Sequence, residues 1–243
     1  MIPQWSISCC RMKARNCPFC DTENIALTFE PTSAWYRVRS RVLSTAGDVS
    51  LCAGLGAIVE PYVIAFTHDH FKRVVELQGR IRSDLFDSLD QCIESGLFPS
   101  DSLCVFEHGG GSSSGDTACV EHCHLHIVDG RFDLRGELAA HFPKANDVEM
   151  NESDIFDFEP GYLLAGIYRG GRVIHSLKAD NPNCGSQFFR RLLADKVGSI
   201  EWNWRTHPTP ESALRLCTLW REHVQSSTSG HPPVRCNDPS SIK

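Results

Sequence analysis

Three histidines occupy every second position of the stretch "CVEHCHLHIVDG", namely His122, His124 and His126. With 11 histidines in 243 residues, chance would produce such a run roughly 0.02 times. In a strand, alternate residues lie on one face, so the three imidazoles would form a polar stripe opposite Cys123 and Leu125. Neutral imidazole is a good metal ligand and also a nucleophile toward phosphorus. The stretch therefore predicts a site for metal binding or for nucleophilic catalysis.

The surrounding residues argue against a metal-centred hydrolase. Such a site needs further acidic or histidine ligands, and Asp129 lies at the wrong spacing for a His-x-His-x-Asp-His pattern. A cupin-like site would need a later Glu and His on paired strands, for which the sequence offers no convincing candidate. In nucleophilic catalysis, neighbouring imidazoles and backbone N–H groups of the glycine- and serine-rich loop 109–117 would bind the phosphate oxygens. The sequence favours this second chemistry.

The elements next to the histidines predict how they are held. Residues 118–128 predict a strand, which follows the loop and an earlier strand over 102–108. A helix is predicted from about Arg82 to Ser95, where apolar residues recur at three- and four-residue spacing and Ser83 is a possible cap. The histidines would therefore lie on a strand behind a helix.

Further elements are predicted on both sides of this region. Strand-like segments cover residues 25–30, 34–43 and 62–70, and "FKRVVEL" is a short helical stretch. Later residues predict a hairpin with Gly170 and Gly171 in its turn, a helix over 186–197 that buries Val197, and a helix that starts at Pro210. Few parallel crossovers are visible, so an α+β fold with an antiparallel sheet is favoured.

Composition narrows the class of protein. A net charge of −6 argues against a nucleic-acid-binding surface, and the apolar runs fall short of the roughly 20 residues that span a bilayer. The 12 scattered cysteines favour reduced thiols in the cytoplasm over a secreted disulfide framework. The basic start of the chain is compatible with a mitochondrial transit peptide, which is the less favoured location.

The histidine stretch resembles the His-φ-His-φ-His-φ-φ motif of the histidine triad (HIT) superfamily of nucleotide hydrolases and transferases, with Cys123 as the first φ. "NCPFCDTE", "EPYVIAFTHDHFKRVVEL" and "VFEHGGG" are similar to other segments of that family. "SQFFRRLLADKVG" with "WNWR" resembles, more loosely, the C-terminal extension of larger members. The resemblance implies a HIT-like antiparallel sheet with flanking helices and a C-terminal α/β extension.

This resemblance divides the chain into four parts. Residues 17–135 would form the HIT-like catalytic domain, and residues 136–224 an extension packed on it. Residues 1–16 are expected to be a flexible N-terminus, and the polar residues 225–243 a disordered tail. A nucleotide substrate is the expected partner, with a second copy in a homodimer as a further one; neither nucleic acid nor a membrane is expected.

Carried over to this sequence, the family's motif assigns roles to single residues. The middle histidine, His124, is the expected nucleophile, and His126 is expected to contact the phosphate. Family members often place a ribose- or phosphate-contacting residue before the glycine loop, a role that His108 or Glu107 could fill. Cys119 occupies the position where one branch has a serine that assists the leaving group.

The zinc-containing branch of the family implies a structural zinc held by Cys17, Cys20, His70 and His122. His70 is chosen over His68 because only His70 keeps the family's distance to Glu76. A Cys-x-x-Cys pair alone means little, since chance gives roughly 0.6 such pairs in this chain. Its weight comes from completing the four-ligand set that tetrahedral zinc requires. The alternative is a metal-free pair of thiols packed under the sheet.

The sequence also departs from the family pattern. Cys119 replaces the serine, Asp129 replaces the proline that often follows the histidine strand, and "IAFTHDH" replaces the Ile-Pro-Lys-x-His approach to the zinc histidine. These differences leave the branch and the leaving group open. Outside the motif, one set of polar residues is interpreted as an exposed helix face rather than as ligand contacts: Gln187, Arg190 and Arg191.

The activity that the resemblance implies is cleavage of the α-phosphoryl bond of a nucleoside 5′-phosphoryl compound through a nucleotidyl-His124 intermediate. Dinucleoside polyphosphates and nucleoside phosphoramidates are the expected substrates, and hydrolysis is favoured because water is always available. Two alternatives stay open. One is a nucleotidyltransferase with a specific acceptor, and the other is a non-catalytic nucleotide-binding or interaction protein.

Overall fold

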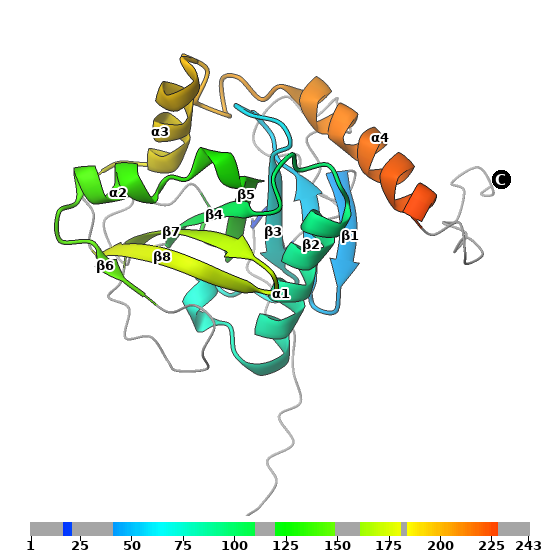
Figure 1. Cartoon of the computed structure of the whole chain (residues 1–243), viewed down its shortest axis with the longest axis horizontal. Coiled ribbons are helices and arrows are strands. Elements are labelled where there is room, and N and C mark those ends of the chain that lie inside the picture. The colour runs from blue at the N-terminus through cyan, green and yellow to red at the C-terminus, as the bar shows by residue number, and fades with distance from the viewer. Residues whose placement is uncertain (1–16, 21–40, 110–119, 149–160, 181–183, 228–243) are drawn as a thin grey trace, which may run out of the picture.

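The computed structural model describes residues 17–20, 41–109, 120–148, 161–180 and 184–227 (Figure 1). Within these residues, strands form one eight-stranded sheet in the order β1-β2-β3-β5-β4-β7-β8-β6. The strands are β1 (Val42–Ala46), β2 (Val49–Ala53), β3 (Val63–Thr67), β4 (Leu103–Gly109), β5 (His124–Asp129), β6 (Asn146–Asp147), β7 (Tyr162–Arg169) and β8 (Arg172–Asp180). All neighbouring strands pair antiparallel, which confirms the predicted α+β class.

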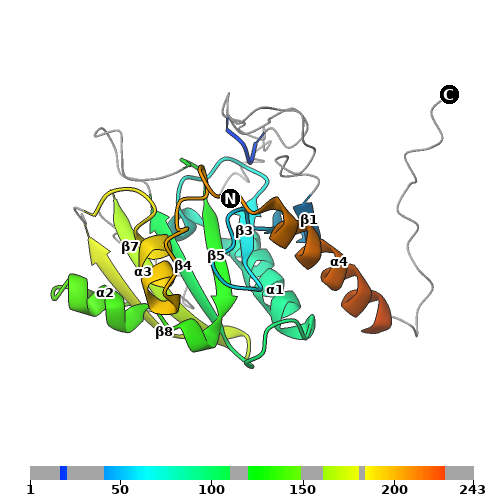
Figure 2. The same ribbon diagram turned by 90° about the horizontal axis from the view of Figure 1, so that it is seen from above.

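Helices cover both faces of this sheet. They are α1 (Gly79–Glu94), α2 (Arg135–His141), α3 (Phe188–Val197) and α4 (Pro210–Ser227), with short 3-10 helices η3 (Val74–Glu76) and η4 (Gly130–Phe132). Figure 1 shows α2 and α3 beside the end of the sheet formed by β4, β7 and β8, and α4 beside the β1 end. Figure 2 shows that α4 extends past the β1 edge.

Alternation along β4 and β5 divides the apolar side chains between two cores. Val105 and Leu125 lie in the core that contains Leu89 of α1. Phe106, one residue further along β4, lies in the opposite core, with Phe189 of α3. Burial of one such side chain contributes about 1.5–3 kcal/mol to the free energy of folding. A shift of β5 by one residue would remove its apolar side chains from the core, so the two cores fix the face that its histidines occupy.

The histidine strand is shorter than predicted. β5 starts at His124 rather than near residue 118, and residues 118 and 119 lie outside the described part of the chain. The chain leaves the sheet geometry just before β5, where the N–H of Cys123 donates to the carbonyl of Phe71 at 2.6 Å. The apolar face is as predicted, because Cys123, Leu125 and Ile127 are buried in the same core.

The main helix starts earlier than its sequence signals indicate. α1 begins at Gly79 instead of about Arg82, so Ser83 lies inside the helix and is not its cap. The reason is that Ile81 packs against the core and extends the apolar face toward the N-terminus. The end is as predicted, since Gly96 follows α1 with a φ of 68°. The predicted helical stretch over 71–77 forms only the 3-10 helix η3.

The C-terminal elements follow the sequence closely. The hairpin of β7 and β8 turns at Gly170 and Gly171, whose φ values are 57° and 79°, as predicted. Val197 is 40% exposed at the last residue of α3, contrary to the prediction that it is buried. α4 begins at Pro210 as expected and continues to Ser227, three residues beyond the predicted end of the ordered chain. Residues 1–16 and 228–243, predicted to be disordered, lie outside the described residues.

The hairpin belongs to the same sheet as the histidines. β7 pairs with β4 along its whole length, from Leu103 with Tyr168 to Gly109 with Tyr162. The backbone of Leu103–Phe106 in β4 is therefore paired on both sides, with β5 and with β7. Residues 161–180 thus extend the sheet that carries the histidines.

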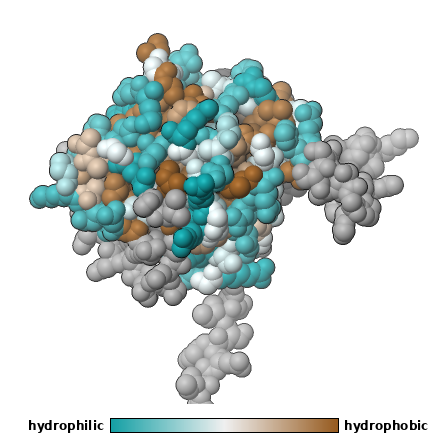
Figure 3. All heavy atoms as spheres, in the orientation of Figure 1, coloured by the Kyte–Doolittle hydropathy of each residue, from teal (hydrophilic) through white to brown (hydrophobic). Residues whose placement is uncertain are grey.

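The surface offers few exposed large apolar side chains. Among the described residues these are Val197, Ile200, Leu214, Leu219 and Val224. On the face shown in Figure 3, hydrophobic atoms of the coloured residues are interspersed with hydrophilic ones. Over the part of the chain that the structure describes, no helix combines the length and the apolar character needed to cross a bilayer.

Candidate functional site

Four side chains with metal-ligating atoms meet beside the start of β5. The sulfur or ring nitrogen atoms of Cys17, Cys20, His70 and His122 all lie within 4.8 Å of one another. The Sγ of Cys17 lies 3.3 Å from Nδ1 of His122, and the Sγ of Cys20 lies 3.2 Å from Nδ1 of His70. The fold thus brings together all four residues expected to bind zinc, and this cluster can hold a metal ion.

A backbone carbonyl determines which nitrogen of His122 faces the sulfur atoms. Nε2 of His122 lies 2.8 Å from the carbonyl oxygen of Thr67, which can only accept a hydrogen bond. Nε2 therefore carries the proton, and Nδ1 presents its lone pair to Cys17 and Cys20. Burial lowers the pKa of His122 to about 4, so the ring is neutral. Metal-ligating histidines commonly donate their other N–H in this way.

Two further observations concern the proposed ligands, Cys17 and the histidine after β3. Burial raises the pKa of Cys17 to about 11, so this thiol stays neutral unless a cation lies beside it. His68, the rejected alternative ligand, lies elsewhere, with its Nε2 2.8 Å from the hydroxyl of Ser50. His70, not His68, is the histidine in the cluster.

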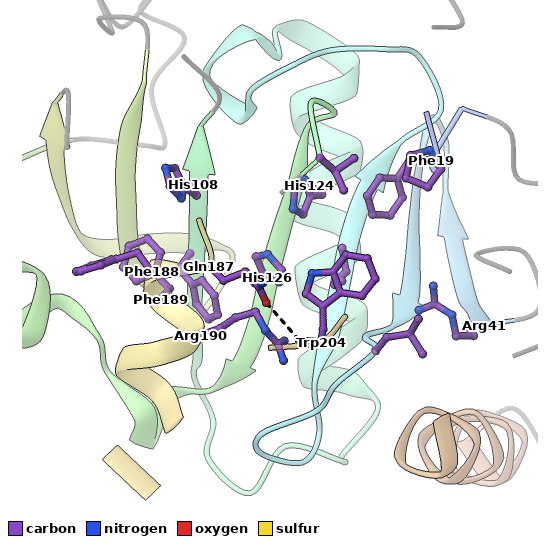
Figure 4. A pocket seen from close by; sticks show the side chains of 15 residues that line it. Phe19, Arg41, His108, His124, His126, Gln187, Phe188, Phe189, Arg190 and Trp204 are labelled. Atoms are coloured by element: carbon purple, nitrogen blue, oxygen red, sulfur yellow. Dashed lines mark hydrogen bonds between the residues drawn. The ribbon is translucent and has the colours of Figure 1, made fainter. Parts of the chain in front are cut away.

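A pocket opens next to this cluster. It contains about 800 Å³ of space not filled by atoms, with the solvent at its open mouth included. Figure 4 shows His124 and His126 of β5 and His108 of the neighbouring β4 around it. Apolar residues form most of the remaining wall: Pro18, Phe19, Leu55, Ile64, Phe106, Val120, Phe188, Phe189 and Trp204. The described lining includes Arg41, Gln187 and Arg190 but no acidic residue.

His124 presents one defined nitrogen to this pocket. Its Nδ1 lies 2.6 Å from the carbonyl oxygen of His122 and must donate a proton to it. In the neutral ring, Nε2 is then unprotonated and available to a molecule in the pocket. Burial lowers the pKa of His124, which keeps the ring neutral, and the ring of Phe19 stacks on it with centroids 5.4 Å apart.

His126 lies beside His124 with its ring held on two sides. The two imidazole centroids are 5.0 Å apart and nearly perpendicular, and Phe106 stacks on His126 at 5.0 Å. Nδ1 of His126 lies 2.9 Å from the hydroxyl oxygen of Tyr62. Burial, then the neighbouring His124 and the positive charge of Arg190, hold the pKa of His126 well below its usual range.

His108 also lines the pocket, with no partner for its ring. Among the described residues, neither Nδ1 nor Nε2 of His108 has a hydrogen-bond partner, although both atoms are buried. Burial lowers its pKa to about 4, so the ring is neutral. A buried polar atom without a partner costs about 1–3 kcal/mol, which a bound ligand could recover. His108 is therefore a ligand contact that the geometry supports.

Glu107 does not reach the pocket. As a neighbour of His108 on β4 it points to the opposite face, where it is 1% exposed. There its carboxyl group accepts hydrogen bonds from the backbone N–H of Val74, at 2.8 Å, and from the hydroxyl of Tyr162. Of the two residues considered before the glycine loop, only His108 lines the pocket. Cys119, the other expected contact, lies outside the described residues.

The interpretation of Gln187, Arg190 and Arg191 as an exposed helix face is wrong for the first two, and Arg191 is half-buried. Gln187 is 7% exposed and Arg190 is 4% exposed, and both line the pocket. Arg190 is buried because its guanidinium donates to Tyr62, Gly56 and the carbonyl of Trp202.

Sequence reasoning also missed Tyr62. It is separated from Arg190 by 128 residues, so no local spacing could have connected the two. The only available signal was the pair of glycines in "CAGLGAI". An added Cβ would lie 2.1 Å from the Tyr62 ring at Gly54 and 2.8 Å from the Arg190 guanidinium at Gly56.

Comparison with known proteins does not extend this description. No protein-family model matches the chain, and no curated protein matches it. The chemistry of the site is therefore argued from its residues and distances.

Proposed function

We propose that this chain is a HIT-like nucleotide hydrolase of the zinc-containing kind, which cleaves a nucleoside 5′-phosphoryl compound at its α-phosphorus. The observation that carries the proposal is the tautomer of His124. Its Nδ1–H is committed to the carbonyl of His122 at 2.6 Å, which leaves Nε2 with a free lone pair at the wall of the pocket. A neutral, oriented imidazole nitrogen is the group that nucleophilic attack on phosphorus requires.

The reaction would proceed in two steps. Nε2 of His124 forms a bond to the α-phosphorus while the bond from phosphorus to the leaving group breaks, and the leaving group departs with the electron pair. The ring then carries a positive charge, which the His122 carbonyl stabilises through the retained Nδ1–H. Water next attacks phosphorus, the N–P bond breaks, and the electron pair returns to Nε2. The water proton passes to solvent, and the nucleoside monophosphate is released.

His126 and His108 would bind the oxygens of the phosphoryl group. A neutral imidazole can donate one N–H to an oxygen that becomes more negative in the transition state. Both rings lie in the pocket beside His124, and none of the described lining residues is acidic, so no carboxylate repels a phosphate there. Phe19 and Trp204 would provide apolar faces for a base or a ribose, since aromatic rings stack well on nucleobases.

Zinc is the metal that suits the cysteine and histidine cluster. Tetrahedral zinc binds sulfur at about 2.3 Å and nitrogen at about 2.0–2.1 Å, which places these donors roughly 3.5 Å apart. Three of the four Sγ–Nδ1 separations in the cluster are 3.2, 3.3 and 3.5 Å. Bound by these four residues, zinc would cross-link the Cys17–Cys20 segment to the sheet and hold His122, whose carbonyl orients His124.

The test is release of nucleoside monophosphate from diadenosine tetraphosphate, adenosine phosphoramidate and a UDP-sugar. Wild type is compared with His124→Ala, and His223→Ala is the control because His223 is an exposed histidine on α4. The proposal expects wild type and His223→Ala to release product from one substrate and His124→Ala to release none.

Other results would contradict the proposal and indicate what replaces it. Equal activity in His124→Ala and wild type would show that His124 is not the nucleophile. Turnover only after an acceptor is added would replace hydrolysis by nucleotidyl transfer. Nucleotide binding without turnover under either condition would indicate a binding protein. Rapid loss of activity on chelation without unfolding would indicate a metal-centred reaction.

A further inference from the structure

A chain of hydrogen bonds links α3 to the last histidine of the motif. The Nη1 group of Arg190 donates to the hydroxyl oxygen of Tyr62 at 3.0 Å, and that oxygen lies 2.9 Å from Nδ1 of His126. Arg190 lies on α3, Tyr62 is the residue just before β3, and His126 lies on β5. Tyr62 is 1% exposed and Arg190 is 4% exposed, so bulk water does not compete for these bonds.

The chemistry of the groups favours one direction for the bonds of this chain. A guanidinium can only donate, so the Tyr62 oxygen accepts from Arg190, and this polarises the hydroxyl and favours donation of its own hydrogen to Nδ1 of His126. Nδ1 of His126 is then an acceptor and carries no proton. In a neutral imidazole the proton must therefore be on Nε2, the opposite nitrogen. His126 becomes a donor toward the pocket, whereas His124 presents an unprotonated Nε2.

Arg190 is itself held firmly in place. Its Nε donates to the carbonyl of Trp202 at 2.8 Å, and Nη2 donates to the carbonyl of Gly56. The guanidinium carbon lies 5.3 Å from the centre of the Tyr62 ring, within the range of a cation–π contact. These contacts hold the guanidinium against the Tyr62 hydroxyl, which lies between Arg190 and His126.

Two glycines make this arrangement possible. A Cβ at Gly54 would lie 2.1 Å from the Tyr62 ring, and one at Gly56 would lie 2.7 Å from Trp204 and 2.8 Å from Arg190. Gly56 also has a φ of 64°, which side chains larger than hydrogen rarely adopt. The segment between β2 and β3 is thus shaped to admit the tyrosine and the arginine side by side.

We propose that Tyr62 and Arg190 are positioning residues that hold His126 in its Nε2–H form, as a hydrogen-bond donor to the phosphoryl group. The role deepens the proposed function and rests on it, but the tautomer itself can be tested without substrate. The inference makes α3 and the segment after it part of the active site, although they follow the histidine motif by about sixty residues.

The direct test is nitrogen NMR of the ¹⁵N-labelled histidine rings in the full chain without nucleotide. Wild type is compared with Tyr62→Phe, which removes only the hydroxyl, and with Tyr168→Phe as the matched control. Tyr168 is also fully buried, and its hydroxyl donates to Asp90 at 2.7 Å in the α1-side core. Wild type and Tyr168→Phe should show His126 as the Nε2–H form, and Tyr62→Phe should show a mixture of the two neutral forms.

A kinetic readout separates positioning from simple structural support. Tyr62→Phe should lower kcat for the cleaved member of the nucleotide panel by roughly 10- to 100-fold with a smaller change in KM. Tyr168→Phe should stay within about twofold of wild type, since its hydroxyl bond lies away from the pocket. If Tyr62→Phe does not fold, Arg190→Lys tests the same relay from its other end, because lysine keeps the charge without the planar fork.

The outcomes are distinguishable. A single Nε2–H form of His126 in both Tyr62→Phe and Arg190→Lys would overturn the proposal, as would an Nδ1–H form in wild type. If the NMR result is as expected but wild type cleaves no nucleotide, the positioning of His126 stands and the proposed hydrolase function fails. If the NMR result is as expected but kcat of Tyr62→Phe equals that of wild type, the catalytic role of the relay is wrong.

Discussion

His122 and His124 stand two residues apart, yet they present opposite nitrogens to their surroundings. His122 donates its Nε2–H to the Thr67 carbonyl at 2.8 Å and turns Nδ1 toward the cysteines. His124 donates its Nδ1–H to the His122 carbonyl at 2.6 Å and keeps Nε2 for the pocket. In each case a backbone carbonyl fixes the tautomer by accepting a hydrogen bond from one ring nitrogen. The other nitrogen keeps its lone pair, which faces the cysteines in His122 and the pocket in His124.

The two regions are also physically coupled. The His122 backbone that orients His124 belongs to the residue whose ring lies in the metal-ligand cluster. A metal bound there would fix the carbonyl to which His124 donates. We therefore expect that a substitution in the pocket can abolish activity without loss of the metal. Loss of the metal, in contrast, should also disturb the pocket.

The largest expected effect comes from a substitution in the pocket that leaves the metal-ligand cluster intact. His124→Ala removes the nucleophile and should lower kcat/KM for nucleotide cleavage by at least about 10⁴-fold, or roughly 5.5 kcal/mol in the barrier. Zinc content, measured by atomic absorption, should stay at the wild-type value because His124 is not among the four ligands. Substantial zinc loss in this variant would contradict the separation of the two sites.

The second-largest expected effect comes from removing one residue of the metal-ligand cluster. Cys20→Ser removes one of the four ligands and should lower both zinc content and the free energy of unfolding, by about 4 kcal/mol when free zinc is a thousandfold above its Kd. Chelation of wild type should act in the same direction, with activity falling in step with the folded fraction followed by circular dichroism. Full stability of the chelated protein in urea would show that the cluster does not hold a structural metal.

A smaller effect concerns Glu107, on the face of the sheet opposite the pocket. Burial raises its pKa from the usual 4.5 to about 8. Between pH 4.5 and about 8, the folded chain therefore holds a proton that the unfolded chain releases. The free energy of unfolding is highest below this range and declines as the pH rises through it, by up to about 1.4 kcal/mol per pH unit.

Glu107→Gln should remove this decline. Urea unfolding of wild type and variant across the same pH values isolates the carboxyl group, because the two proteins differ only at this position. Parallel curves for the two proteins would contradict the raised pKa.

The smallest expected effect tests whether the metal site includes Glu121. Glu121 lies next to His122 in sequence, but its side chain is 58% exposed and pairs with Lys72 at 3.6 Å. An exposed pair of this kind is worth about 0.2–1 kcal/mol. Glu121→Gln should therefore change the free energy of unfolding by less than about 1 kcal/mol, with zinc affinity unchanged in a competition titration. A tenfold loss of affinity would extend the metal site to this residue.

Local patterns predicted much of the site. Alternation in "HCHLHIV" places Leu125 and Ile127 in the core, and the glycine pair of the hairpin predicts its turn. The four expected metal ligands were identified by resemblance, and the fold does bring them together. Each of these signals is a short-range spacing or a familiar motif, which a single sequence displays directly.

The contacts that the sequence did not reveal depend on tertiary packing. Arg190 on α3 is buried because it meets Tyr62 and Gly56, more than 120 residues earlier in the chain. A helical arginine ordinarily belongs to a solvated face, so its sequence context gave no signal of burial. Likewise, Glu107 and His108 are neighbours that lie on opposite faces of β4, and the register with β7 sets which face each occupies.

The most direct test of the central claim is to trap the covalent intermediate. Wild type would be mixed with diadenosine tetraphosphate, adenosine phosphoramidate or a UDP-sugar, quenched rapidly at alkaline pH, digested, and analysed by mass spectrometry. The account predicts a nucleotidyl group on the peptide that carries His124, attached to that residue and labile in acid. A nucleotidyl group on another residue, or product formation with an unmodified His124 at every time point, would contradict it.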